Sequence, residues 1–389
     1  TITAGNCTFQ IIKGLKILDP VTQAVNLIVE TAGTTPGGAT LVAVYRDRAV
    51  WAKDRLWFMS RQGDHTDYNY GAAASDVQRA VAGTVAEAGQ PGNAIIALAP
   101  GGDDYLVLFS DESTWVLRGD PAFGGQIDNV SRTVGAVGPH AWCHGPSGEI
   151  YHLSKSGLFV MPPGAGGVPQ PVSQQKLPRD LKDADYDNHE VSLVYDSVQD
   201  GIYIYATPRT QLTGTHYWYD FGTQSFWPLQ FGNDDHQPIG AVAYSSNPTK
   251  ERSVTMLGLD GYIRHFINND SVSDDDGTAL NSHVVLGPFN ASGSSMLEGI
   301  ISEIAGIIDL DSSASVTMQI YIADTAEAAR DAATTATSPK YSTTFTAGRT
   351  RPKHPRVRAN SFCIRLSCAG RWAYEALNTR LAAGGRIRS

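Results

Sequence analysis

The feature of the sequence that most constrains its fold is a series of short apolar runs that recur along the chain. Each run has four or five residues, is rich in β-branched, aliphatic or aromatic side chains, and is mostly bounded by Gly, Asp, Asn, Ser or Pro. The runs before residue 260 are 41–45, 55–59, 105–109, 150–153, 158–161, 191–195, 202–205 and 254–257. All are too short for amphipathic helices, so the pattern predicts an all-β chain.

The spacing of these runs predicts the architecture. One residue that closes a run can serve as a marker for each unit: Ser60, Ser110, Ser154, Tyr205 and Leu257. Successive markers are 50, 44, 51 and 52 residues apart, which suits propeller blades of about four short strands each. Since the segment before residue 42 has room for a further unit, we expect a β-propeller of five to seven blades.

Composition excludes several other classes of protein. Of the 389 residues, 42% are hydrophobic and 18% are charged, and 39 Gly and 20 Pro interrupt the chain too often for coiled coils or long helical repeats. Four scattered cysteines (Cys7, Cys143, Cys363 and Cys368) do not suit a disulfide framework and fit a reducing compartment. No run approaches the roughly 18 apolar residues of a membrane helix, and no signal-peptide pattern opens the sequence, so we expect no membrane segment.

Three stretches depart from the β-pattern. Residues 75–89 carry three valines at four-residue spacing and a terminal Gly, which predicts a surface helix. Residues 324–335 are Ala-rich with an acidic start and predict a second short helix. Residues 268–281 contain three consecutive Asp and predict a linker.

Beyond this linker the strand-like runs become longer and alternate more regularly. They are 284–286, 300–308, 315–322, 341–345, 361–367 and 372–376. Alternation of this kind is typical of half-buried antiparallel strands, and a β-sandwich of about 100 residues can bury them. We therefore expect residues 1–280 to form the propeller and residues 281–389 to form a β-sandwich with a basic C-terminal stretch.

Charge is distributed unevenly along the chain. Residues 349–389 carry ten of the 30 Lys and Arg residues but only one acid, Glu375. The remaining chain holds 20 basic and 38 acidic residues, so an acidic body of −18 carries a basic stretch of +9. Chains with such asymmetry usually have charged partners. The densest basic cluster consists of Arg349, Arg351, Lys353, Arg356 and Arg358.

This cluster has three possible roles. Its side chains can simply face water from alternate strand positions, pair with acids of a neighbouring subunit, or contact nucleic-acid phosphates. On an extended chain residues 349, 351 and 353 share one face, and residues 356 and 358 join them if the chain kinks near Pro355. No aromatic residues are interleaved for base stacking, so we assign the cluster to a subunit interface rather than to DNA binding.

Candidate metal sites fail on spacing. His140 and His144 flank Cys143, but on a strand the two histidines lie about 13 Å apart, and no second ligand pair follows. The acids at 274–276 and at 309 and 311 lack the alternating loop and distal Glu of a calcium hand. We expect no metal and no cofactor.

Catalytic motifs are also missing from the sequence. The Asp-box of propeller sialidases, Ser-x-Asp-x-Gly-x-Thr-Trp, is only echoed at 110–115 and at 60–66, where Asp111 and Asp64 lie at different spacing. No phosphate loop, dinucleotide fingerprint, nucleophile elbow or zinc-protease motif occurs. We expect no enzymatic activity, and a carbohydrate-active propeller protein, either a sialidase-like enzyme or a host-glycan binding module, remains the alternative.

Segments 47–71, 95–121 and 135–164 resemble the propeller of virion proteins of short-tailed bacteriophages. The similar types are the tail hub, nozzle and head-completion (packaged-DNA stabilization) proteins. The shared elements lie at 60–70, at 110–121, which ends in Trp-x-Leu-x-Gly-Asp-Pro, and at 151–159, which reads Tyr-x-Leu-Ser-x-x-Gly-Leu-Phe. The likeness covers 47–280 well and 282–389 loosely, where it includes the Gly384-Gly-Arg ending.

The resemblance implies a structural virion protein that acts as an oligomeric ring. Such a ring lies below the portal-adaptor, contacts other tail proteins, and lines and closes the DNA exit channel without reading the DNA sequence. It implies a location in the virion tail after assembly in the host cytoplasm. An acidic body suits this role because it disfavours adhesion of DNA to the channel wall. The motifs leave hub, nozzle and stopper open.

Overall fold

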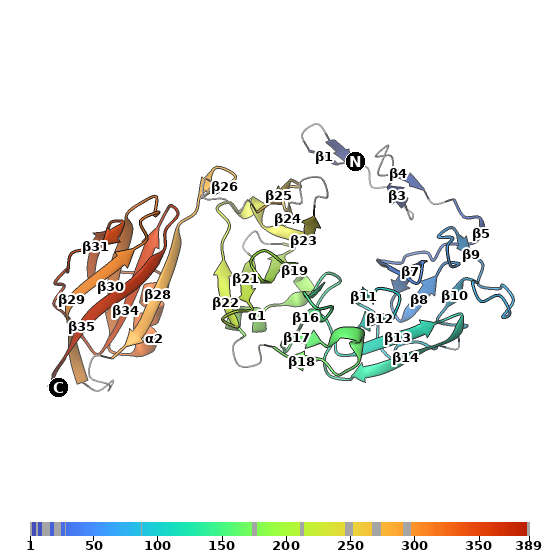
Figure 1. Ribbon diagram of the computed structural model, residues 1–389, viewed down its shortest axis with the longest axis horizontal. Helices are drawn as coiled ribbons and strands as arrows, with labels where there is room; N and C mark the ends of the chain where they lie inside the picture. Colours follow the sequence, from blue (N-terminus) through green and yellow to red (C-terminus); the bar gives the residue numbers. More distant parts are fainter. Residues whose placement is uncertain are drawn as a thin grey trace. The chain divides into compact units, whose positions relative to one another are not determined.

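The computed structural model describes residues 2–4, 7–9, 16–18, 25–27, 29–86, 88–172, 177–210, 214–245, 252–266, 274–290 and 297–386. The chain forms two compact units, one of Thr1–Gln230 with Asp234–Phe266 and one of Phe231–Asn233 with Ile267–Ser389 (Figure 1). Strands make up most of the regular structure of both units, so the predicted all-β class is confirmed. No helix within the described ranges is long and apolar enough to cross a bilayer.

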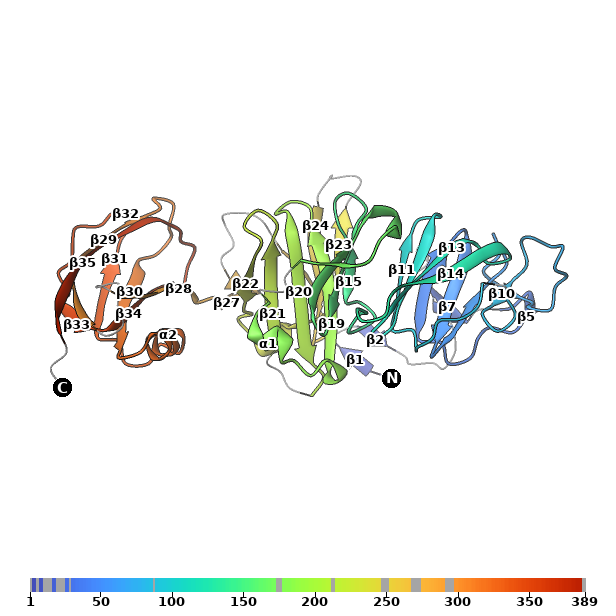
Figure 2. The same ribbon diagram turned by 90° about the horizontal axis from the view of Figure 1, so that it is seen from below.

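The first unit is a β-propeller built from successive antiparallel sheets, which we number 1 to 5 in chain order (Figures 1 and 2). Sheet 1 contains β6 (Leu41–Tyr45), β7 (Arg48–Lys53), β8 (Leu56–Met59) and β10 (Val81–Ala82). Sheet 2 contains β11 (Ala97–Gly101), β12 (Tyr105–Phe109), β13 (Thr114–Asp120) and β14 (Phe123–Ser131). Sheet 3 contains β15 (Trp142–His144), β16 (Ile150–Ser154), β17 (Gly157–Met161) and β18 (Gln170–Pro171).

Two more sheets follow sheet 3, and several short strands precede sheet 1 in the sequence. Sheet 4 contains β19 (His189–Asp196), β20 (Gly201–Pro208), β21 (Thr215–Asp220) and β22 (Ser225–Leu229), and sheet 5 contains β23 (Pro238–Ser245), β24 (Arg252–Gly258) and β25 (Ile263–His265). Ahead of sheet 1, β1 (Ile2–Ala4) pairs with β2 (Cys7–Phe9) and β3 (Lys16–Leu18) pairs with β4 (Val25–Leu27). The next strand, β5 (Ala32–Gly33), pairs in parallel with β9 (Asp67–Tyr68), which lies between β8 and β10 in the sequence. Helix α1 (Arg179–Lys182) and 3-10 turns at Pro163–Ala165, Tyr186–Asn188 and Asp234–His236 lie in connections.

Neighbouring propeller sheets pack face to face, so alternate residues of one strand enter two different cores. In β12, Leu106 and Leu108 join the core shared with sheet 1. Val107 and Phe109 join the core shared with sheet 3, which also contains Ile150. Because both faces of β12 are covered, all five of its residues are buried and the strand reads as an unbroken apolar run.

One of the five sequence markers lies on a different strand from the others. Ser110, Ser154 and Tyr205 close or belong to the second strand of their sheets, and Leu257 lies in the second strand of sheet 5. Ser60 instead follows β8, the third strand of sheet 1. The 50 residues between Ser60 and Ser110 therefore run from the third strand of one sheet to the second strand of the next, and are not the length of one repeat. The first unit ends at Phe266, against a predicted boundary at residue 280.

The helix predicted over 75–89 is wrong. The described residues of the segment, 75–86 and 88–89, form turns, irregular connections and the short strand β10, whose Val81 and Ala82 pair with Met59 and Phe58. Its three valines do not share a face, since Val81 is buried whereas Val77 and Val85 are exposed. Pairing with β8 satisfies the backbone of this segment in place of helical hydrogen bonds.

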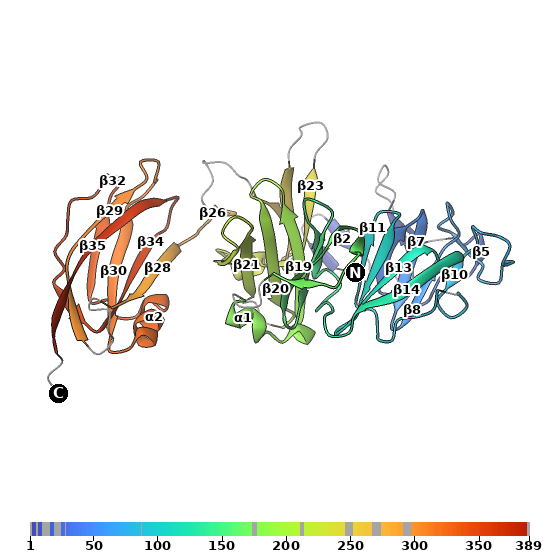
Figure 3. The same cartoon turned by 60° about the horizontal axis from the view of Figure 1, so that its bottom comes forward.

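The second unit is a two-layer β-sandwich (Figure 3). Sheet A has the order β28 (Ser282–Phe289), β34 (Ser361–Cys368), β30 (Val316–Ala323) and β31 (Tyr341–Phe345). In sheet B the central β29 (Leu297–Ile308) pairs with β32 (Gly348–Arg349) and β33 (Val357–Ala359) along one side and with β35 (Tyr374–Arg386) along the other. Residues from both sheets form the core, including Ile304, Met318 and Ile364.

Helix α2 (Ala326–Thr334) confirms the prediction over 324–335. The Thr325 side chain caps its first turn by accepting a hydrogen bond from Ala328 N at 3.2 Å. Ala329 and Ala333 pack against Tyr321 and Cys363 on sheet A. Within the predicted linker, β26 (Asp274–Asp275) and β27 (Thr278–Ala279) form a small hairpin.

Gly135, in the junction between sheets 2 and 3, leaves no room for a side chain. A Cβ on Gly135 would lie 1.9 Å from the Ser110 carbonyl oxygen, and that oxygen is held at 2.9 Å by Ala136 N. We expect Gly135→Ala to lower the free energy of unfolding by about 1–3 kcal/mol, measured by urea denaturation. Gly166→Ala is the matched control, since a Cβ there meets nothing within 4 Å. Equal losses in both variants would contradict this explanation.

Candidate functional site: a basic sheet edge

The basic cluster predicted as an interface lies along the outer edge of sheet B. Residues 348–359, which we call the basic edge, run antiparallel to β29. Ile307 lies opposite Arg349, Ile304 opposite Lys353, and Ile300 opposite Arg358, so the structure brings the cluster together on one strand path.

The basic edge is bulged rather than flat. Between Arg349 and Lys353 it has one residue more than the facing stretch of β29, and between Lys353 and Arg358 it again has one more. Arg356 has a positive φ of 51°, consistent with the bend near Pro355 that the sequence indicated. Each bulge turns the chain. As a result, side chains that a regular strand would direct to the core can point outward.

The charges of the basic edge are available to a partner. Arg349, Arg351, Arg356 and Arg358 are exposed and Lys353 is half-buried. None of the five forms an ion pair with another residue that the structure describes. Charges and prolines on an edge also prevent pairing with a further strand. Binding here therefore depends on side-chain charge rather than on strand addition.

The outward face of sheet B next to this edge is less charged. Ile300 lies between Arg358 on one side and Ala382 on the other, in the register of β33, β29 and β35. Farther along β29, Glu303 lies opposite Arg380, a cross-strand pair of opposite charge. A partner that covers the basic edge can therefore also contact Ile300 and Ala382 beside it.

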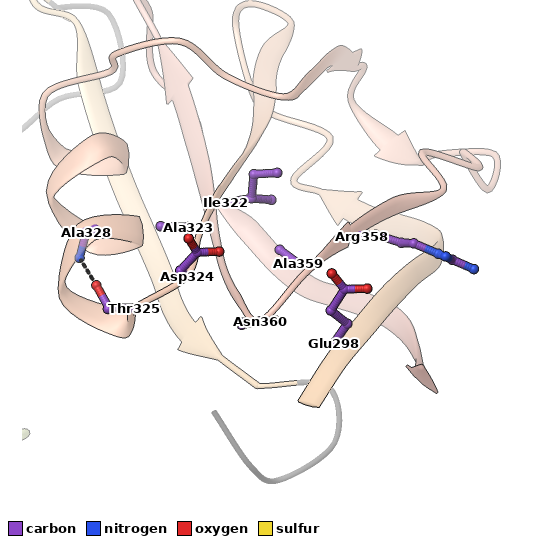
Figure 4. Close-up of a pocket in the computed structure, with 9 residues that line it drawn as sticks. All are labelled: Glu298, Ile322, Ala323, Asp324, Thr325, Ala328, Arg358, Ala359 and Asn360. Carbon is purple, nitrogen blue, oxygen red and sulfur yellow. Dashed lines mark hydrogen bonds between the residues drawn. The ribbon is translucent and has the colours of Figure 1, made fainter. Parts of the chain in front are cut away.

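A cavity of about 600 Å³ lies at the end of the basic edge (Figure 4). The side chains of Glu298, Asp324 and Arg358 line it together with the first turn of α2. That turn is already capped by Thr325. Among the described lining residues none has an aromatic ring on which a sugar or base could stack, so we assign no ligand to the cavity.

The structure does not bring the residues considered as metal ligands together, and the linker acids accept local hydrogen bonds. Cys143 is buried, which raises the pKa of its thiol, whereas His144 is exposed at the end of the same strand. In the linker hairpin, Asp274 accepts a hydrogen bond from Gly277 N at 2.9 Å, and Asp275 accepts one from Gly232 N at 2.7 Å. In the described part of the chain no three His, Cys, Asp or Glu side chains are grouped for a metal ion.

The two acids of the Asp-box echoes are also engaged locally. Asp64 accepts hydrogen bonds from the hydroxyl and the backbone N of Thr66, which lower the pKa of its carboxyl. Asp111 pairs with Lys155 at 2.7 Å. Both acids are therefore held by polar contacts of their own or a neighbouring loop.

An acidic cluster on the propeller was not singled out from the sequence. Asp111, Glu112 and Asp187 surround Lys155: its hydrogen bond to Asp111 raises the pKa of the ammonium, and the charges of Asp187 and Glu112 raise it further. Asp111 and Glu112 lie in the loop after β12 and Asp187 lies in the Tyr186–Asn188 turn, so the acids come from two separate loops that only folding brings together. We call Asp111, Glu112 and Asp187 the acidic propeller cluster.

Comparisons with known proteins give distant structural likenesses. No family model matches the chain, and no curated protein matches it. The extracellular domain of a one-component system from B. thetaiotaomicron aligns with a TM-score of 0.37 and 12% identity over 72% of this chain, which spans 38% of that chain. YCF48 from Cyanidioschyzon merolae aligns with a TM-score of 0.34 and 15% identity, covering 63% of this chain and 72% of that one.

A third solved structure aligns over both units. It is the exo-beta-1,3-galactanase from Phanerochaete chrysosporium with galactose, at a TM-score of 0.30 and 8% identity, covering 97% of this chain and 100% of that one. At these TM-scores and identities the likenesses assign no function.

Proposed function

We propose that this chain is a structural subunit of a bacteriophage tail ring, assembled by charge pairing between copies. The observation that carries the proposal is the basic edge, where four exposed arginines and Lys353 have no ion-pair partner among the described residues. A chain with an acidic body of −18 offers a complementary surface on its neighbour. The resemblance of segments 47–71, 95–121 and 135–164 to phage tail proteins is the reason that we propose a tail ring as the assembly.

The acidic propeller cluster is the partner surface that we assign to the basic edge. Asp111, Glu112 and Asp187 share one Lys155, which leaves excess negative charge at loops of sheets 2 to 4. A contact from the sandwich edge of one copy to the propeller of the next is heterologous, and such contacts form rings when the rotation closes. A ring of this kind lies below the portal-adaptor in the virion tail and lets DNA pass without sequence recognition.

Charge reversal tests this pairing. We expect the quadruple variant Arg349→Glu, Arg351→Glu, Arg356→Glu and Arg358→Glu to remain folded, because exposed pairs contribute roughly 0–1 kcal/mol each. Its incorporation into tails, measured as copies per purified particle after complementation of a gene-deleted phage, should fall at least tenfold. The loss should be greatest at low salt, where screening is weakest.

Two further variants separate pairing from other effects. Arg330→Glu changes an exposed arginine of α2 in the same unit and should assemble normally. Adding Asp111→Arg, Glu112→Arg and Asp187→Arg to the quadruple variant should restore incorporation, because the two surfaces then have exchanged signs. Normal assembly of the quadruple variant would overturn the assignment of the basic edge.

The carbohydrate alternative predicts a different result. The structural proposal is wrong if three results are found together. The purified chain cleaves sialosides or host polysaccharides, Asp64→Asn or Asp111→Asn abolishes this turnover, and no copy of the chain is present in tails. We expect no turnover on such a panel.

A further inference from the structure

Sheet B has two edges that differ in how they are protected against pairing with a further strand. The basic edge is bulged, charged and interrupted by prolines. The opposite edge is β35, which runs for 13 residues and pairs with β29, and no other strand that the structure describes pairs with it (Figure 2). Half of the backbone N–H and C=O groups of such a strand point away from its one neighbour. Long edge strands of this kind are templates for pairing with another chain.

Residues 376–383 form the regular part of β35. Each of them lies opposite a residue of β29, and the one irregularity along this stretch is Ser302, an extra residue of β29. The stretch reads Ala-Leu-Asn-Thr-Arg-Leu-Ala-Ala, so it contains no proline and Arg380 is its single charge. Leu377 and Thr379 are half-buried, and the other residues of the stretch are exposed. Bulges, prolines and clustered charges, which protect natural edge strands, are therefore absent from residues 376–383.

The two faces of this stretch differ in character. Leu377, Thr379 and Leu381 lie opposite buried residues of β29 and therefore point to the side of the sandwich core. Leu381 is still 37% exposed, at the edge of its sheet. The alternate residues, at even positions from 376 to 382, point to the outer face. A strand added at this edge would therefore bring apolar side chains against the two leucines and small or polar side chains against the outer face.

We propose that the added strand is β35 of a second copy of this chain, paired antiparallel about a two-fold axis at Thr379. In such a pair each residue faces the residue that lies equally far on the other side of the axis. Thr379 then faces Thr379 of the second copy, and Leu377 faces Leu381 on both sides of the axis. Threonine pairs and apolar pairs directly across two strands both stabilise a sheet.

The outer face fits the same register. Arg380 faces Asn378 of the second copy, and Ala376 faces Ala382. An axis at Arg380 would instead place two arginines opposite each other, which destabilises a sheet, and an axis at Asn378 would separate the two leucines. Of the three registers centred on residues 378–380, the one at Thr379 is therefore the most favourable. Since one sequence supplies both strands, this register identifies a second copy as the occupant.

This pairing does not depend on the proposed tail ring. A two-fold contact closes after two copies, whereas a ring requires a heterologous contact that repeats. The basic edge and β35 lie on opposite sides of β29, so the two contacts use different edges of sheet B. We therefore assign the dimer to the free protein in solution.

Two double variants of the full chain test the register on its outer face, where Ala376 and Ala382 are both exposed. Ala376→Glu with Ala382→Glu places two pairs of like charges across the axis, whereas Ala376→Glu with Ala382→Lys places two pairs of opposite charges there. Sedimentation equilibrium measures the Kd of each dimer. We expect the unmodified chain to dimerise, and the Kd of the first variant to be at least about tenfold higher than that of the second. An unmodified chain that stays monomeric up to about 0.1 mM, or a Kd that does not differ in this direction, would overturn the proposal.

Hydrogen exchange gives a second answer that requires no variant. The amides of residues 376–383 that point away from β29 should become protected as the protein concentration rises through the monomer–dimer transition. Amides of β31, an edge strand of sheet A, should exchange at a constant rate. The quadruple arginine variant should still dimerise, which distinguishes loss of the ring contact from loss of this pairing. Unchanged exchange along β35 in a dimer would overturn the proposal, because another surface would then hold the two copies together.

Discussion

Replacing Arg48 with methionine is expected to lower the free energy of unfolding by about 3–5 kcal/mol. Arg48 is 1% exposed at the start of β7. Its Nη1 donates to the carbonyl oxygens of Ser60 at 2.9 Å and Arg79 at 2.6 Å, and its Nη2 donates to that of Val77 at 3.2 Å. Nη2 also lies 3.4 Å from Asp120 of the next sheet.

The size of this loss follows from what the guanidinium satisfies. Without it, the buried carbonyl of Ser60, the part-buried carbonyls of Val77, Gln78 and Arg79, and one carboxylate lose a donor at once. An unsatisfied buried acceptor costs about 1–3 kcal/mol. Burial lowers the pKa of Arg48, while the neighbouring Asp120 opposes that change, so the pair keeps the side chain ionised. Arg48 thereby joins sheet 1, its following loop and sheet 2.

A partly exposed arginine just after β8 of the same sheet provides the control. Arg61 pairs with Asp76, both about one third exposed, so Arg61→Met should cost no more than about 1 kcal/mol. Urea denaturation of both variants measures the difference. Similar values for Arg48→Met and Arg61→Met would contradict the role assigned to Arg48.

Acidification from pH 6.5 to 4 is expected to destabilise the propeller by on the order of 5 kcal/mol through two buried histidines. Burial lowers the pKa of His152 and that of His216 from 6.5 to about 4. His152 Nδ1 donates to the Gly135 carbonyl at 2.9 Å, and its ring packs against Phe109. His216 Nε2 lies 3.1 Å from the Gln237 amide oxygen.

The direction follows from proton binding. Between pH 6.5 and 4 the unfolded chain binds a proton at each histidine that the folded chain does not, so the free energy of unfolding decreases as the pH falls. Urea denaturation at several pH values measures this slope. His152→Phe removes one of the two protons and should reduce this contribution by about half, whereas replacement of the exposed His140 by Phe should leave it unchanged. An unaltered slope in His152→Phe would contradict the argument.

Much of the fold could be predicted because it depends on local patterns. The runs of four or five apolar residues became strands, and the acidic start and alanines of 324–335 became α2. The segment 75–89 failed because its pairing with β8 is a long-range contact that helical spacing does not reveal. The marker Ser60 was misplaced for a related reason, since strand order within a sheet is not encoded in spacing alone.

The candidate site was predicted only in part. The cluster from Arg349 to Arg358 stands out in the sequence, but its position along β29 depends on a register with two bulges. The acidic propeller cluster joins two loops that are distant in the sequence and has no sequence motif. Arg48 shares the buried face of β7 with Val50 and Ala52. An arginine is buried at such a position only when other groups accept its hydrogen bonds, and the sequence alone does not show which groups these are.

A cryo-EM map of the virion that contains this chain tests the central claim most directly. We expect the propeller and sandwich to repeat around the tail axis, with the basic edge of one copy facing Asp111, Glu112 and Asp187 of the next. Absence of the chain from the tail, or its presence as isolated copies whose basic edges face solvent, would contradict the account.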